Sequence, residues 1–199
     1  ITPDARALAG VRASILRAEG RTEEAQRALD DYVADHNDFN AYWMRAVYLT
    51  EQGEIELAEK DYRKLTTFAE RGTTGYELLS NFYVRTDKLD KAAATLEEGA
   101  GAYPEDLGLK RRLMKTLFLR GHPEDLQKAL EILSTLEERL PQDPELMKLR
   151  ALQILQESTP ESLKTAREKL EHVVQLEPTA VDAHLVLIRI AMQEGDYQA

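Results

Sequence analysis

Residues 76–104, YELLSNFYVRTDKLDKAAATLEEGAGAYP, contain the pattern that decides the fold. Tyr76, Leu79 and Tyr83 recur at intervals of three and four residues, which is typical of one face of an α-helix. The polar residues 85–88 interrupt the pattern, and a second amphipathic segment follows. Pro104 ends this segment, because a proline ring cannot continue a helix beyond its first turn. The stretch is therefore predicted to be a pair of helices joined by a short turn.

This helix pair recurs along the whole chain. The predicted breaks between helices lie 33, 34, 34, 37 and 37 residues apart, at Gly20, Gly53, Asp87, Gly121, Ser158 and Gly195. A period near 34 residues predicts a stacked array of repeats rather than separate globular domains. We expect one elongated domain with repeats at residues 5–38, 39–71, 72–105, 106–142 and 143–179, and a partial repeat at 180–199.

Small residues recur where the two helices of a repeat are expected to cross. Helices that approach to about 8–10 Å need small side chains on both sides. The expected crossing residues are Ala13, Ala46, Ser80 and Ala151 on first helices, facing Ala25, Ala58, Ala92 and Ala166 on second helices. Met114 is the exception, and we expect the lengthened turn after Gly121 to let the helices of this repeat separate. Beside Ala58, Glu59 is expected on the exposed side.

With these residues assigned, the chain resembles the tetratricopeptide repeat family. The second repeat, for example, supplies Tyr42, Ala46, Gly53, Ala58 and Tyr62 at the positions that the family pattern favours. The resemblance implies an all-α, right-handed α-solenoid of about five and a half repeats. It also implies a bacterial array, cut from a longer protein, that acts as a scaffold for protein–protein interaction.

Composition limits the function further. There are 36 acidic and 26 basic residues, a net charge of −10, so we expect neither nucleic-acid binding nor insertion into a membrane. The chain has no cysteine, and its four histidines fall in different repeats without a metal-ligand spacing. No nucleophile or phosphate-binding motif occurs. We therefore expect a protein without catalytic activity, cofactor or metal; cytoplasm and periplasm both remain open.

The first helix of each repeat is expected to line a concave groove beside the core. The candidate groove residues are Trp43, Met44, Val47, Leu78, Asn81, Arg85, Arg111, Arg112 and Lys115. The groove is predicted to be apolar with a basic middle, which would suit a peptide with acidic and apolar residues. The alternative is that the basic residues pair internally with acids such as Glu77, Glu105 or Asp106.

Two other functions remain open: a homotypic assembly or spacer domain, and a ligand-responsive regulatory domain of a larger protein. Residues 183–192 are apolar on nearly every side of the expected helix. In the family such a helix is followed by a second helix that covers it. We expect self-association through residues 183–192, with Leu187 and Ile190 at the contact. Both biological assembly and truncation of a longer chain would explain such association.

Overall fold

The computed structural model describes residues 5–195, excluding the side chains of residues 5–8 and 194. The last four residues of the predicted partial repeat 180–199 lie outside the described residues. All regular structure in the described part is helical. The helices are α1 (Ala5–Ala18), α2 (Thr22–His36), α3 (Phe39–Gln52), α4 (Ile55–Leu65), η1 (Ala69–Arg71), α5 (Thr74–Arg85), α6 (Leu89–Ala102), α7 (Leu107–Arg120), α8 (Pro123–Arg139), α9 (Pro144–Ile154), η2 (Leu155–Glu157), α10 (Pro160–Leu176) and α11 (Val181–Glu194).

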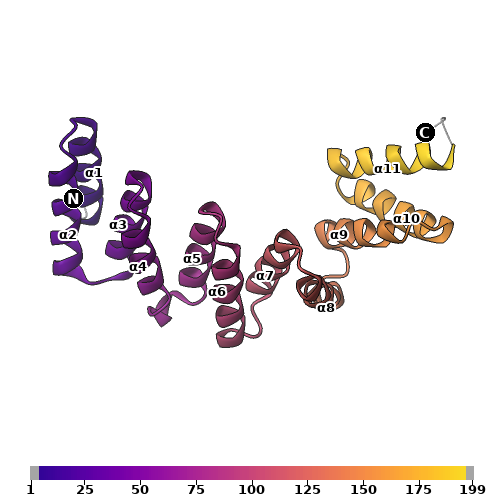
Figure 1. Ribbon diagram of the computed structural model, residues 1–199, viewed down its shortest axis with the longest axis horizontal. Helices are drawn as coiled ribbons and strands as arrows, with labels where there is room; N and C mark the ends of the chain where they lie inside the picture. The colour runs from indigo at the N-terminus through magenta and orange to yellow at the C-terminus, as the bar shows by residue number, and fades with distance from the viewer. Residues whose placement is uncertain (1–4, 196–199) are drawn as a thin grey trace. The chain divides into compact units, whose positions relative to one another are not determined.

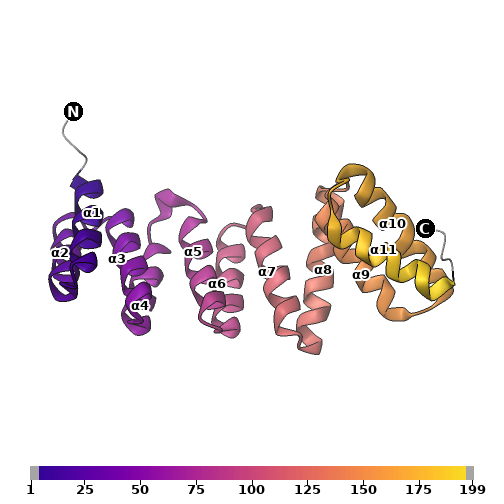
Figure 2. The same ribbon diagram turned by 90° about the horizontal axis from the view of Figure 1, so that it is seen from above.

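The chain divides into two compact units, Ile1–Arg120 and Gly121–Ala199. The division falls in the lengthened turn of the predicted fourth repeat, so α7 belongs to the first unit and α8 to the second. Within each unit, helices that follow one another in sequence pack side by side (Figure 1). Figure 2 shows the same order from above. Each unit is therefore built from local helix pairing.

The turns between helices adopt the conformation that the sequence pattern requires. All six predicted break residues have positive φ, from 54° at Ser158 to 81° at Gly53. The left-handed region is unfavourable for residues with a Cβ atom, so glycine occupies four of these six positions. Asp87 and Ser158 are the two exceptions. Each break thus reverses the chain within a few residues and lets the next helix pack back on the previous one.

The helix crossings are tight in both units. Ala13, Ala46, Ser80 and Ala151 are buried on first helices, and Ala25, Ala58, Ala92 and Ala166 are completely buried on second helices. In the first unit, aromatic residues fill the space around these crossings: Tyr62 stacks on Phe82 with ring centroids 4.8 Å apart. In the second unit, Leu170, Val173 and Ile190 join Ala151 and Ala166 in one core.

The structure overturns the expectation that Glu59 is exposed. Its side chain is only 16% exposed and lies among residues of α5 and α6. It accepts hydrogen bonds from Tyr83 Oη at 2.9 Å and from Lys91 Nζ at 2.6 Å. Glu59 faces the next repeat rather than solvent, because α4 packs against α5 on this side.

The expected exposure of Ile190 is also wrong. Ile190 is 1% exposed in the core of the second unit, and Leu187 packs against that core. The apolar residues that α11 leaves exposed are Val181, Leu185, Ile188 and Met192.

Candidate functional site: an apolar groove in the first unit

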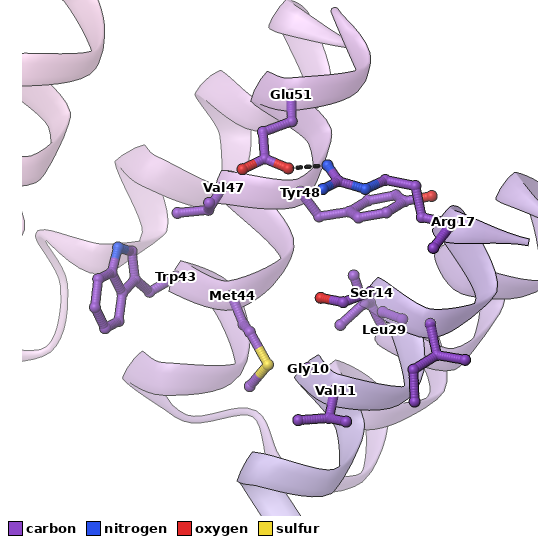
Figure 3. A pocket seen from close by; sticks show the side chains of 13 residues that line it. Gly10, Val11, Ser14, Arg17, Leu29, Trp43, Met44, Val47, Tyr48 and Glu51 are labelled. Atoms are coloured by element: carbon purple, nitrogen blue, oxygen red, sulfur yellow. Dashed lines mark hydrogen bonds and ion pairs between the residues drawn. The ribbon is translucent and has the colours of Figure 1, made fainter.

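An apolar pocket of about 670 Å³ lies between α1 and α3 (Figure 3). Leu29 of α2 contributes to its lining, and α3 supplies three residues that the sequence singled out: Trp43, Met44 and Val47. Their spacing places these three side chains on one sector of the helix. The apolar positions of α1 that face them are Val11 and Ile15. We call this hollow the α1–α3 pocket.

The close approach of α1 and α3 depends on Gly10. Met44 reaches toward Gly10 in Figure 3, and a Cβ atom at Gly10 would lie 2.8 Å from the sulfur of Met44. The missing side chain therefore lets Met44 lie against the backbone of α1. Gly10 and Met44 are 34 residues apart, so they are equivalent positions of neighbouring repeats.

The polar groups around this pocket are mostly satisfied within the protein. Arg17 of α1 pairs with Glu51 of α3, again 34 residues apart. Tyr48 Oη donates a hydrogen bond to the carbonyl oxygen of Thr22 at 3.1 Å. Burial raises the pKa of Tyr48, while the nearby charge of Arg17 acts in the opposite direction. The lining therefore offers a ligand mainly apolar surface, with one ion pair beside it.

A second pocket of about 440 Å³ lies between α3 and α5. Trp43 and Val47 line this pocket as well, so the two hollows share one ridge. The residues that α5 contributes include three predicted candidates, Leu78, Asn81 and Arg85. We call this hollow the α3–α5 pocket, and the two hollows together the groove.

The predicted basic middle is only partly present in the groove. Arg85 lines the α3–α5 pocket and makes no ion pair with any residue of the described part. Arg112 of α7 instead donates a hydrogen bond to Asn81 Oδ1 at 3.2 Å and lies 3.6 Å from Glu77 Oε2. This is the internal pairing that the sequence left as an alternative.

The other two predicted basic residues, Arg111 and Lys115, line neither pocket, and both interact within the protein. Sequence reasoning did not include Ile15, Tyr48, Glu51 or Val84, all of which line the groove. The 34-residue spacing of Arg17, Glu51 and Arg85 was a signal that could have found Glu51.

Metal-binding and membrane-spanning features were searched for in the same residues. Across residues 5–195, no three His, Cys, Asp or Glu side chains gather closely enough to hold a metal ion. In that range, no helix combines the length and the apolar character needed to cross a bilayer.

The stacked helix pairs and the groove define a class: a helical-repeat protein that presents an extended surface. Residues 11–72 match the profile of the family described as "Tetratricopeptide repeat". The chain is a tetratricopeptide repeat protein, and the expected all-α solenoid class is confirmed. Repeats of this kind generally mediate protein–protein or peptide interactions, and their proteins are typically scaffolds without catalytic activity.

Solved structures with the same fold extend over most of the chain. YrrB, described as a tetratricopeptide repeat protein with an unusual peptide-binding site, has a TM-score of 0.60 at 16% identity, with 87% of each chain covered. PilF from Pseudomonas aeruginosa has a TM-score of 0.62 at 20% identity, covering 96% of this chain and 85% of PilF.

A third structure is MamA, from residue 41 to its end, from Desulfovibrio magneticus RS-1. It has a TM-score of 0.59 at 18% identity and covers 90% of this chain and 99% of MamA. At such identities the likeness shows the fold alone. A comparison with curated protein sequences finds no significant match.

Proposed function

We propose that the first unit binds a peptide segment or helix of a partner protein in the groove. A large apolar side chain of the partner occupies the α1–α3 pocket, and a carboxylate of the partner faces Arg85. The observation that carries this proposal is the α1–α3 pocket itself, about 670 Å³ of mainly apolar lining on a strongly charged protein.

The exposed apolar residues of the groove support this assignment. Val11, Ile15, Trp43 and Val47 are all exposed although each carries a large apolar side chain. Covering such side chains removes apolar surface from water, which favours association. Trp43 lies on the ridge that both pockets share, and tryptophan is enriched among residues that dominate binding energy.

Charge supports an acidic partner over a basic one at this place. Glu51 pairs with Arg17, and Glu77 lies beside Arg112, so the two acids nearest the groove have cationic partners. Arg85 is the cation that remains for a ligand, and its guanidinium suits a carboxylate in bidentate geometry. The peptide-binding site named for YrrB is a precedent on the same fold.

A random peptide library displayed on phage tests the proposal without a known partner. The wild-type chain is expected to enrich sequences that combine large apolar residues with Asp or Glu. Val47→Asp should lose these binders, because it places a charge on the shared ridge. Leu57→Asp is the matched control: Leu57 is 39% exposed against 37% for Val47 and lines neither pocket. Equal loss in both variants, or no enrichment at all, would contradict groove binding.

Trp43 provides a direct signal for selected peptides because it is the only tryptophan of the chain. Binding in the groove should change its fluorescence emission, and Arg85→Gln should weaken binding about tenfold, the effect of losing one charge-assisted contact. Added salt should weaken wild-type binding and have a smaller effect on Arg85→Gln. A salt response that is unchanged in Arg85→Gln would show that the carboxylate is recognised elsewhere.

A further inference from the structure

Helix α11 of the second unit has one face that is fixed against the core. Ala183, Ile190 and Ala191 are buried there, and Leu187 packs beside them. At the start of the helix, Asp182 pairs with Lys148 of α9. These contacts set the rotation of α11 about its axis and decide which residues point away from the core.

The opposite face of α11 carries four exposed apolar residues. Val181 is 68% exposed, Leu185 61%, Ile188 52% and Met192 62%. Their spacing of four, three and four residues places them in one row along the helix. We call this row the α11 stripe. A continuous row of half-exposed large apolar side chains is typical of an interaction surface.

We propose that the α11 stripe is a two-fold interface with a second copy of this chain, in which two α11 helices pack antiparallel. The stripe is symmetric about its midpoint between residues 186 and 187: Leu185 and Ile188 are equally far from it, and so are Val181 and Met192. An interface between identical copies related by a two-fold axis must be complementary to itself. Antiparallel packing meets this condition, since each pair then lies opposite its counterpart.

The charges beside the stripe agree with this arrangement. Asp182 and Arg189 follow Val181 and Ile188 by one residue each and are seven residues apart, so they lie on the same flank of the stripe. In an antiparallel pair of helices the same flanks of the two copies meet. Asp182 of one copy then lies near the Arg189 position of the other, and opposite charges approach each other.

The size of the surface sets the expected strength. Four residues from each copy form a contact smaller than a standard protein–protein interface, so the dimer should be weak and should depend on concentration. Sedimentation velocity over a wide concentration range is expected to show a monomer–dimer equilibrium without larger species. This proposal does not depend on peptide binding in the groove, which belongs to the first unit.

Two lysine substitutions form a matched pair. Ile188→Lys should abolish the dimer, because it places a charge at the centre of the stripe. Ile15→Lys should leave the dimer unchanged, since Ile15 is 53% exposed against 52% for Ile188 but lies on α1 in the first unit. Loss of association in Ile15→Lys, or an array larger than a dimer, would show head-to-tail packing and overturn the proposal. A wild-type chain that is monomeric at every concentration would also overturn it.

Crosslinking tests the antiparallel direction, because the chain has no cysteine of its own. A mixture of Val181→Cys and Met192→Cys chains should crosslink, since these positions face each other. Val181→Cys alone should not, because eleven residues of helix separate its two copies by about 16 Å, beyond the span of a short bifunctional maleimide. Crosslinking of Val181→Cys alone would show parallel packing and refute the two-fold model.

Discussion

Glu59 offers the sharpest test of the packing described for the first unit. Its carboxylate lies between α4, α5 and α6, where Tyr83 Oη, Lys91 Nζ and Lys88 Nζ donate hydrogen bonds at 2.9, 2.6 and 3.3 Å. Arg63 lies 3.5 Å away and also donates a hydrogen bond to Tyr83 Oη. One side chain thus links two neighbouring repeats.

These partners set the pKa of Glu59. Burial alone would raise the pKa, but the hydrogen bonds from Lys91, Tyr83 and Lys88 outweigh burial and lower it from 4.5 to about 2. At about 1.4 kcal/mol for each pH unit, this difference corresponds to about 3 kcal/mol of folding free energy. Lys91 and Arg63 are half exposed or more, so solvent screens part of the interaction, and we expect about 2 kcal/mol.

The perturbation is Glu59→Gln, which keeps the shape of the side chain and removes its charge. It should lower the free energy of unfolding by about 2 kcal/mol at pH 7. Because the folded pKa lies below the unfolded pKa, the stabilisation is present above about pH 4.5 and is lost as the pH falls towards 2. The difference between wild type and variant should therefore shrink over this range.

Urea denaturation followed by circular dichroism at pH 7, 5, 3 and 2 measures this difference. Glu56→Gln on the same helix is the control: Glu56 is exposed, and its substitution should change stability by less than about 0.5 kcal/mol. The reasoning is refuted if Glu59→Gln and Glu56→Gln have equal effects at pH 7, or if the effect of Glu59→Gln persists unchanged at pH 2.

Three further predictions concern packing. Ala58→Leu should destabilise the first unit by about 1–3 kcal/mol in urea denaturation, because Ala58 is completely buried at the crossing of α3 and α4; wild-type stability would contradict this crossing. Gly75→Ala should cost a similar amount, about 1–3 kcal/mol, since a Cβ atom there would overlap the carbonyl oxygen of Leu65. Gly101→Ala, where a Cβ atom meets nothing within 4 Å, should be neutral or stabilising by about 0.5 kcal/mol, and equal effects of the two glycine substitutions would refute the assignment. Ile190→Lys should unfold the second unit and lower its thermal midpoint far more than Ile188→Lys does; equal midpoints would show that the faces of α11 are assigned wrongly.

Local features of the fold could be predicted because they depend on short stretches of chain. The breaks at Asp87 and Ser158 have no glycine, yet the repeat spacing identified both, and both adopt positive φ. The alanines at the helix crossings follow from the same spacing, because a fixed period places equivalent residues at equivalent contacts. The helix starts at Pro123 and Pro160 also follow from local chemistry, since proline fits the first turn of a helix.

Contacts between repeats could not be predicted in the same way. Glu59 binds residues 24 to 32 positions further along the chain, and nothing near Glu59 in the sequence distinguishes it from a solvated acid. Arg45 likewise holds the buried Asp61 of α4 with hydrogen bonds of 2.7 and 2.8 Å. Such pairs depend on the rotation and offset of neighbouring helices.

The groove shows the same boundary. The sequence alone determined that Trp43, Met44 and Val47 share a sector of α3 beside the core. Tertiary structure decided that Arg112 pairs with Asn81 and Glu77, leaving Arg85 to face the groove.

On α11 the sequence determined a helix that is apolar on nearly every side, and for that reason it could not say which side is covered. Tertiary structure decided this through the packing of Ile190 and the pairing of Asp182 with Lys148. The physical reason is that amphipathic periodicity reveals orientation only where polar residues mark the solvent face.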